Sequence, residues 1–289
     1  MSGQTRASEQ TRAGLKTGKR WTLDDIHWDR FDGQKLDPEI VKIVKAASLV
    51  EYNGTDYATY LCNVFADDPD FQVVARNWAE EEVQHGLALG RWAHMADPSF
   101  DFARTFERFT EGYRLPLDAT ASVRGSRAGE LVARCVVEVG TSANYSALGA
   151  ATVEPVLKEI CRYIAADEFR HYKLFYTHMK RYLEIERISK LRRLAVALGR
   201  LTESQDDELA YAYYAANGCD DEPYDRKRSA RAYAARTFSY FRPLEVERSV
   251  AMTFRAVGLS PRSQLARWTT RGANWLLRSR QKRFAQTGF

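Results

Sequence analysis

A glutamate followed three residues later by a histidine occurs twice in the sequence, and each copy comes 31 or 30 residues after a further glutamate. The two sets are Glu51 with Glu82 and His85, and Glu138 with Glu168 and His171. Residues three apart share one face of a helix, so each pair can direct a carboxylate and an imidazole at one point. A separation of about 30 residues equals half a helix, a turn and half of the next helix. This separation therefore predicts that each lone glutamate lies level with the Glu-x-x-His pair that follows it, on an antiparallel neighbouring helix.

The residues one or two helical turns away from these side chains are mostly apolar. They include Val44, Ala47, Ala58 and Cys62 in the first helix, Ala75, Trp78, Leu89 and Trp92 in the second, Leu131, Cys135 and Tyr145 in the third, and Ile160, Ile164, Tyr172 and Phe175 in the fourth. Because an isolated buried charge is very costly, such groups must be paired or bound to a metal. Four carboxylates and two imidazoles cannot satisfy one another, whereas two divalent cations can neutralise them.

One glutamate from each of two helices, with a Glu-x-x-His motif from each of two others, is the ligand pattern of ferritin-like di-iron and di-manganese proteins. The predicted ligands are Glu51, Glu82, His85, Glu138, Glu168 and His171. A set of carboxylates with two imidazoles suits iron or manganese better than zinc or calcium. A solvated helix face would explain one such motif, but not two with matching spacing and apolar surroundings.

The fold class expected from the hydrophobic pattern is all-α, because the chain shows helical periodicity without strand-like alternation. Asp37-Pro38 and Asp68-Pro69 each place a capping residue before a proline at a helix start. We expect helices over 38–66, 69–95, 100–113, 125–150, 153–184, 186–201, 205–217, 226–240, 244–256 and 262–284. The division expected is a disordered arm over 1–20, a ferritin-like four-helix bundle over 21–201 and a basic helical C-terminal extension over 202–289, with 217–225 as a linker.

The charge of the chain is unevenly distributed. From Arg226 onward there are 15 Lys and Arg residues against only Glu245 and Glu247, although the whole chain has a net charge of only +5. The last predicted helix is basic and also carries Trp268, Trp275 and several leucines. A basic amphipathic helix of this kind can lie on an anionic membrane, dock an acidic carrier protein or pack back on the bundle. The acidic body of the chain argues against nucleic acid as a partner.

The compartment expected for this protein is the cytoplasm. The four cysteines are widely spaced, without a CxxC pair, and the first twenty residues lack the apolar stretch of a signal peptide. No apolar run approaches the roughly 20 residues that span a bilayer. If the basic helix binds lipid, the protein would sit peripherally at the inner surface of a membrane.

Two segments resemble those of the soluble acyl-acyl-carrier-protein desaturases. Trp78-Ala-Glu-Glu-Glu-Val-Gln-His-Gly86 resembles their W-x-x-E-E-x-x-H-G segment, and Ile164-Ala-Ala-Asp-Glu-Phe-Arg-His171 resembles their A-D-E-x-R-H segment. Glu138 followed by Thr141 matches a third feature, a ligand glutamate with a threonine three residues later. The resemblance covers roughly residues 28–185. Val83-Gln84 departs from the usual pair between the glutamate and the histidine, so the substrate can differ while the metal centre is kept.

The resemblance implies two iron ions that receive electrons from a ferredoxin-type donor and use O2 to desaturate or hydroxylate an unactivated C–H position of a fatty-acyl substrate. It assigns proton delivery to Thr141 and the orientation of His85 to Asp167, and it offers Trp28 as a candidate for the electron-relay tryptophan. The substrate carrier expected is acyl carrier protein or a membrane lipid. A homodimer is also expected. Five aromatic residues are candidates for lining an apolar channel: Trp78, Trp92, Tyr145, Tyr172 and Phe175.

Other functions are compatible with the same ligand pattern. An arylamine N-oxygenase would carry an additional histidine one turn before the last motif, where this chain has Ile164. A di-iron hydroxylase acting on tRNA is suggested only by the basic C-terminal segment. Iron storage is the non-enzymatic alternative, but ferritins end soon after four helices and about 100 residues follow here.

Overall fold

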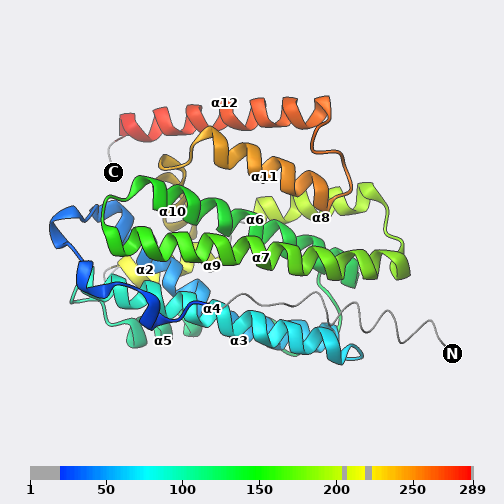
Figure 1. The fold of residues 1–289 in the computed structure, drawn as a ribbon, viewed down its shortest axis with the longest axis horizontal. Coiled ribbons are helices and arrows are strands. Elements are labelled where there is room, and N and C mark those ends of the chain that lie inside the picture. The colour runs from blue at the N-terminus through cyan, green and yellow to red at the C-terminus, as the bar shows by residue number, and fades with distance from the viewer. Residues whose placement is uncertain (1–19, 204–206, 219–222, 288–289) are drawn as a thin grey trace.

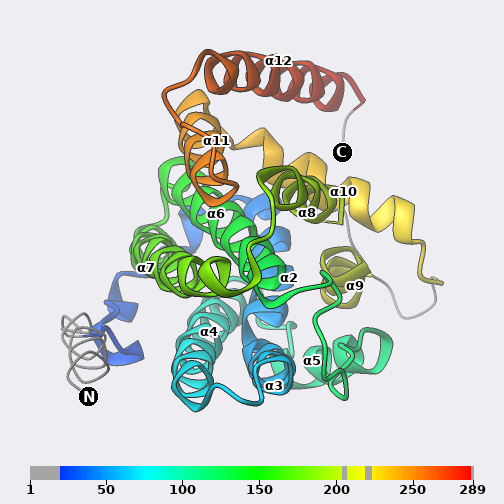
Figure 2. The ribbon, with the colours of Figure 1, turned by 90° about the vertical axis from the view of Figure 1, so that its right-hand side faces the viewer.

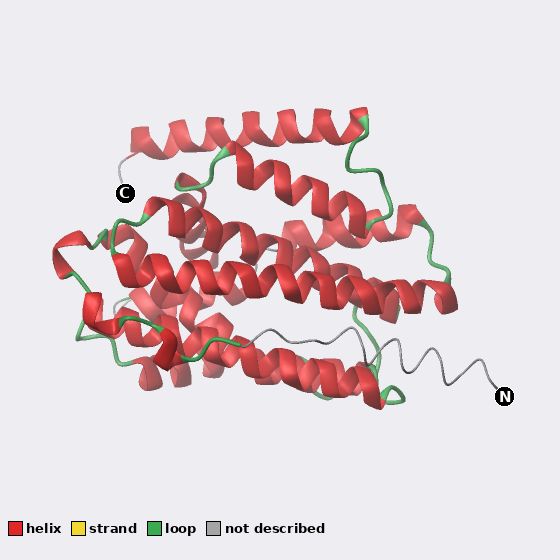
Figure 3. Cartoon of the chain, viewed as in Figure 1, coloured by secondary structure: helices red, strands yellow, loops and turns green. Residues whose placement is uncertain are grey.

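Every regular element of this protein is a helix within residues 20–203, 207–218 and 223–287, the part of the chain that the computed structural model describes (Figures 1 and 3). The prediction of an all-α fold is therefore confirmed for this part. Three 3-10 turns come first: η1 (Leu23–Asp25), η2 (Trp28–Arg30) and η3 (Gly33–Lys35). Nearly all of the arm predicted over 1–20, and the centre of the linker predicted over 217–225, lie outside the described residues.

The helices of the first two thirds of the chain begin and end within a few residues of their predicted bounds. They are α2 (Pro38–Tyr52), α3 (Gly54–Val64), α4 (Pro69–Ala96), α5 (Phe102–Gly112), α6 (Arg127–Ala151) and α7 (Pro155–Glu186). Asp37 caps α2 by accepting a hydrogen bond from Glu39 N, and Asp68 caps α4 by accepting one from Phe71 N. The two Asp-Pro pairs thus start helices as the sequence predicts.

The prediction of a single helix over 38–66 was wrong at one point. The structure has two helices there, α2 and α3, which are separated at Asn53. Two glycines show how closely this junction approaches α4. A Cβ atom on Gly54 would lie 2.6 Å from Cβ of Glu82, and one on Gly86 would lie 2.5 Å from the backbone nitrogen of Tyr52. The junction of α2 and α3 is therefore pressed against α4 backbone to backbone, at the level of the predicted ligands.

The long helices α6 and α7 are antiparallel and are held in register at both ends. At one end the buried Glu154 carboxylate caps α7, accepting from Val156 N and Leu157 N, and also accepts from the indole of Trp92 in α4 at 2.7 Å. At the other end Glu186 of α7 accepts from the first two backbone amides of α6, at 3.0 and 2.7 Å. The Glu186 contacts limit how far α7 can slide along α6, and the Glu154 contact ties the start of α7 to α4. Together they fix which side chains of the three helices lie level.

The remaining helices are α8 (Lys190–Glu203), α9 (Asp207–Asn217), α10 (Arg226–Ser239), α11 (Pro243–Ala256) and α12 (Gln264–Thr287). Helices α8 and α11 pack on α6, and α9 packs on α2 and α5. Helix α12 is outermost, lying over α10 and α11 at the top of Figure 2. The basic extension therefore folds back on the helices that carry the motifs, and its division from the rest at residue 201 stays a prediction. Among the described helices, none combines the length and the apolar character needed to cross a membrane.

The apolar core consists of two clusters stacked along the long helices. One contains Leu49, Leu89, Tyr145 and Ile164, and the other contains Ala58, Ala79, Val139 and Tyr172. On each of the helix segments α2–α3, α4, α6 and α7, the predicted ligands fall at the boundary between the two clusters. The polar groups are thus enclosed above and below by apolar side chains.

Candidate metal centre

The six predicted ligands converge on one point inside the molecule. Glu51 comes from α2, Glu82 and His85 from α4, Glu138 from α6, and Glu168 and His171 from α7. All six are buried, with exposed fractions between 0% and 6%. The register predicted from the spacing of about 30 residues is therefore the register that the helices adopt.

The ligand atoms form two overlapping sets of four. Glu51, Glu82, His85 and Glu168 make one set, and Glu82, Glu138, Glu168 and His171 make the other; within each set the ligand atoms all lie within 4.8 Å of one another. Glu82 and Glu168 belong to both sets because each has two carboxylate oxygens. Either set could hold a metal ion, since both combine one imidazole nitrogen with three carboxylates.

The two imidazole rings are oriented in the same way. Nδ1 of His85 faces the cluster, 3.3 Å from Glu168 Oε1, while Nε2 points outward and lies 3.1 Å from Asp167 Oδ2. Nδ1 of His171 faces the cluster, 2.9 Å from Glu82 Oε1, while Nε2 lies 3.2 Å from Glu81 Oε2. A carboxylate that accepts from Nε2–H leaves Nδ1 free of a proton, which is the state in which an imidazole binds a metal.

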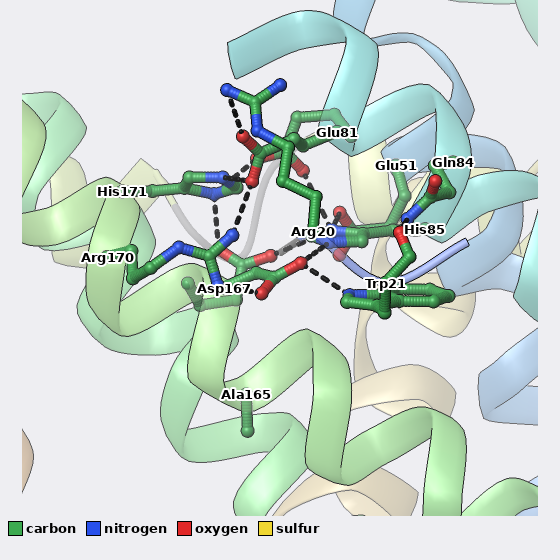
Figure 4. A network of polar contacts seen from close by, with 12 residues as sticks. Arg20, Trp21, Glu51, Glu81, Gln84, His85, Ala165, Asp167, Arg170 and His171 are labelled. Carbon is green, nitrogen blue, oxygen red and sulfur yellow. Dashed lines mark hydrogen bonds and ion pairs between the residues drawn. The ribbon is translucent and has the colours of Figure 1, made fainter. Parts of the chain in front are cut away.

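Asp167 and Glu81 belong to one network on the outer side of the rings (Figure 4). The Trp21 indole donates to Asp167 Oδ2 at 2.7 Å, and Arg170 contacts both carboxylates, donating to Glu81 Oε2 at 2.8 Å. Arg20 pairs with Glu81 at 2.9 Å. Each imidazole is thus held by an acid that is itself held by donors, so the ring orientations are fixed on both sides of the site.

Sequence reasoning found Asp167 but missed Trp21 and Glu81. Trp28, the candidate relay tryptophan, lies elsewhere: its indole donates to Leu23 O at 2.8 Å, and Arg91 covers its ring at 4.1 Å. Trp21 precedes the first α-helix, in a segment without periodicity, so no local pattern connects it to the site. Glu81 stands directly before the predicted ligand Glu82, but its partner His171 is on another helix, and the sequence gives no sign of that contact.

Two hydroxyl groups donate to carboxylates of the cluster. Thr141 Oγ1 lies 2.7 Å from Glu168 Oε2, closer than the carbonyl oxygens of Val137 and Glu138, which are both 3.3 Å away. Tyr145 Oη donates to Glu51 Oε1 at 2.6 Å. Thr141 therefore contacts a predicted ligand as well as its own helix backbone, and Tyr145 is a partner that was predicted only as a channel residue.

The inward-facing atoms of the cluster lack hydrogen-bond partners. They are Oε1 of Glu82, Glu138 and Glu168, and Nδ1 of His85 and His171. His171 Nδ1 is close to Glu82 Oε1, but the two do not meet the angles of a hydrogen bond, and both stay unsatisfied. A buried polar group without a partner costs about 1–3 kcal/mol. Five such atoms aimed at one region fit a bound cation, which would satisfy them together.

Burial and mutual repulsion perturb the acidity of the same groups. Burial, with the nearby carboxylates of Glu82 and Glu168, raises the pKa of Glu51 well above its ordinary value; burial and Glu168 do the same to the pKa of Glu138. Burial opposes protonation of both histidines, but the surrounding carboxylates outweigh it and raise the pKa of His85 and of His171 well above 6.5. Without a cation the cluster therefore retains protons, which a metal ion would displace.

The aromatic residues proposed as channel lining have separate contacts. Trp78 packs edge-on against His171 and Phe175, with ring centroids 6.4 and 5.3 Å apart, so it borders the site. Tyr172 Oη instead donates to Met252 O in α11 at 2.9 Å, and Trp92 donates to the α7 cap. These contacts account for Tyr172 and Trp92 as structural residues.

The three other histidines of the chain lie outside the cluster. His27 Nδ1 is 3.0 Å from Glu159, and His94 Nδ1 is 3.1 Å from the carbonyl oxygen of Phe100. His178 packs edge-on against Phe71, with ring centroids 5.1 Å apart. Structural contacts thus account for each of them.

No protein-family model matches the sequence, and no curated protein matches it significantly. The similarity to acyl desaturases therefore rests on the short motifs alone, and the geometry of the site has to carry the functional argument.

Proposed function

We propose that the four helix segments α2–α3, α4, α6 and α7 form a ferritin-like bundle whose cluster binds two metal ions, iron or manganese. Glu51 and His85 would hold one ion, Glu138 and His171 the other, and Glu82 and Glu168 would serve both. The observation that carries this proposal is the pair of overlapping ligand sets with two inward-facing Nδ1 atoms. Two divalent ions would also balance the four negative charges of the carboxylates.

The activity proposed is an O2-dependent oxidation of an unactivated C–H position of a fatty-acyl substrate, by desaturation or hydroxylation. A redox-active metal pair at this point would supply the binding and reduction of O2, which amino-acid side chains alone do not provide. The resemblance of both motif segments to those of acyl desaturases supports this reaction class. The apolar clusters on both sides support it too, because reactive oxygen chemistry requires water to be excluded.

The side chains around the cluster have separable tasks in this proposal. Thr141 can hold or pass a proton at Glu168 Oε2, the carboxylate oxygen that its hydroxyl contacts. Asp167 keeps His85 in the tautomer with Nδ1 unprotonated, and Glu81 does so for His171. Trp21 replaces Trp28 as the candidate electron-relay residue, because its indole contacts Asp167 directly.

The partners in this proposal follow from the chemistry. An oxidase of this type needs external electrons, for which we propose a ferredoxin-type donor. The acyl substrate is insoluble when free, so it would arrive on acyl carrier protein or in a membrane lipid. We also propose a homodimer.

The first test is metal content. Purified protein reconstituted anaerobically with Fe(II) should bind about two ions per chain, measured by plasma mass spectrometry. Glu168→Ala and His171→Ala should each lose most of this iron, because each removes a ligand. Glu80→Ala is the matched control, since Glu80 is exposed on the same stretch of α4. Full iron content in both ligand variants, or two zinc ions in protein isolated with native metal, would contradict the proposal.

The second test is the reaction. The iron-loaded protein, a chemical reductant and a set of acyl-carrier and phospholipid substrates should give products lighter by two hydrogens or heavier by one oxygen under air. The same mixture under nitrogen should give none, as judged by mass spectrometry. O2 consumption without a change in any acyl substrate would refute acyl oxidation and leave a different di-iron oxygenase or an iron-handling protein.

A further inference from the structure

Helix α12 packs on the molecule along only one side. Ala266 and Leu277 are buried, with exposed fractions of 3% and 8%, and Gln281 donates to the carbonyl oxygens of Phe238 and Phe241 at the end of α10. These contacts hold α12 against α10 and α11 (Figure 2). Of the three alternatives open for the basic helix, packing back on the other helices is therefore observed, but through a side of α12 that does not contain Trp268 or Trp275.

The opposite side of α12 exposes an apolar stripe. Its members are Leu265, Trp268, Trp275 and Leu276, which are 53%, 63%, 67% and 53% exposed. Separations of three, seven and eleven residues place them along one line of an α-helix. Two tryptophans and two leucines on the outermost helix form an unusual surface, because exposed apolar groups of this size normally mark a contact with a partner.

Cations flank this stripe. Arg267, Arg271 and Arg278 form a parallel row on the helix and are all exposed. Arg262 and Lys282 are also exposed, and no acidic residue occurs after Glu247. The surface therefore combines apolar anchors with positive charge and has no nearby carboxylate of its own segment to neutralise it.

We propose that the outer face of α12 binds an anionic membrane surface, with Trp268 and Trp275 inserted at the level of the lipid headgroups. Tryptophan favours that interface, and the neighbouring arginines attract anionic headgroups. An acidic protein would need an apolar groove beside its acidic groups to match this surface, whereas an anionic membrane offers charged headgroups directly above an apolar interior. A membrane thus accounts for both the apolar stripe and the cations beside it. This inference does not depend on the metal chemistry.

The test uses the full chain and sedimentation with phosphatidylcholine vesicles containing or lacking 30% phosphatidylglycerol. Binding should require the anionic lipid and should disappear at about 0.5 M salt, where charges more than a few ångströms apart are screened. Arg271→Gln combined with Arg278→Gln should weaken binding about 30-fold, which corresponds to about 1 kcal/mol for each cation. Trp268→Ala combined with Trp275→Ala should weaken it about tenfold or more, since binding scales with the apolar area buried.

A matched control is Arg76→Gln combined with Arg104→Gln, on α4 and α5, which lie on the side of the molecule away from α12 (Figures 1 and 2). This variant should bind vesicles like the unchanged protein, and so should Glu168→Ala, which tests whether binding is independent of the metal centre. Fluorescence quenching by lipids brominated on the acyl chains should be seen in the unchanged protein and in the control variant when they are bound to vesicles, and it should be lost in the tryptophan variant.

Three outcomes would overturn the proposal. One is the same affinity for vesicles with and without anionic lipid. Another is the same loss of binding in both arginine variants. The third is no binding to anionic vesicles at all. In that case salt-sensitive binding to an acidic protein would assign the stripe to a protein partner, and a dimer that dissociates in the tryptophan variant would assign it to a second copy.

Discussion

Replacing Gly86 with alanine tests whether the junction of α2 and α3 positions the site. The added Cβ atom would lie 2.5 Å from the backbone nitrogen of Tyr52 and 2.6 Å from its Cα atom. Carbon atoms in contact are normally 3.5–4.0 Å apart, so the two helices would have to separate by roughly 1 Å. Backbone atoms cannot rotate out of the way as a side chain can. Gly140 on α6 is the matched control, because a Cβ atom there meets nothing within 4 Å.

The two substitutions should have different effects on stability. Alanine in place of a helical glycine gains about 1 kcal/mol in both variants. In Gly86→Ala, overpacking should cost about 1–3 kcal/mol, so this variant should unfold at a temperature lower than Gly140→Ala. At about 2–4 °C for each kcal/mol in a chain of this size, the difference should be roughly 2–12 °C, measured by circular dichroism in the presence of a chelator.

The larger effect of Gly86→Ala should be on the metal centre. Gly86 follows His85, and Tyr52 follows Glu51, so moving the helices apart also separates two predicted ligands of the same ion. Since functional sites need positions accurate to about 0.5 Å, the iron content should fall and any O2 consumption should drop by up to about 100-fold. Gly140→Ala should keep both, although it lies between Glu138 and Thr141. Equal unfolding temperatures and equal iron content in the two variants would refute the reasoning.

Three further predictions concern single side chains. Asp167→Asn and Glu81→Gln should each lower iron affinity about 10–100-fold, because each replaces the carboxylate that accepts from Nε2 of one imidazole. Unchanged iron titrations would contradict this. Thr141→Val should keep the iron but lower the amount of product formed per O2 consumed several-fold, whereas an unchanged ratio would leave Thr141 with only a structural role. Burial, with a smaller effect of Arg181, lowers the pKa of His178 to about 4, so its neutral form contributes stability above pH 6.5 that is lost as the pH falls toward 4. His178→Phe should therefore reduce the fall in the free energy of unfolding between pH 6.5 and 4 by up to about 3 kcal/mol. An unchanged fall would show that other groups cause it.

The parts of this structure that could be predicted from sequence are those set by local periodicity. Helix bounds depend on capping and on the hydrophobic pattern within a few turns, and Asp37 and Asp68 begin helices as expected. The alignment of Glu51 with Glu82 and His85, and of Glu138 with Glu168 and His171, also has a local origin, because two helices joined by a short turn bring residues about 30 apart to the same level. The meeting of the two sets depends on long-range packing of the helices. Their duplication made the pattern specific enough to be read without a relative.

The parts that could not be predicted depend on contacts between distant segments. The close approach of the α2–α3 junction to α4 depends on Gly54 and Gly86, and a glycine in a sequence does not reveal what it faces. The contact from Trp21 to Asp167 joins residues 146 positions apart. The exposure of Trp268 and Trp275 likewise depends on which side of α12 packs against the molecule, and the amphipathic pattern alone leaves that open.

The energetic cost of the cluster is the strongest argument that it has a function. A buried network of charges can usually be replaced by well-packed apolar residues without loss of stability, so a fold gains little by enclosing one. Here the cluster stands between two apolar regions that could have met directly, and five of its inward-facing atoms have no hydrogen-bond partner. Asp167, Glu81, Thr141 and Tyr145 nevertheless orient it from outside through well-formed contacts. Support on the outer side combined with unsatisfied atoms on the inner side is what a site for a cation requires, and a purely structural network would have satisfied the inner atoms first.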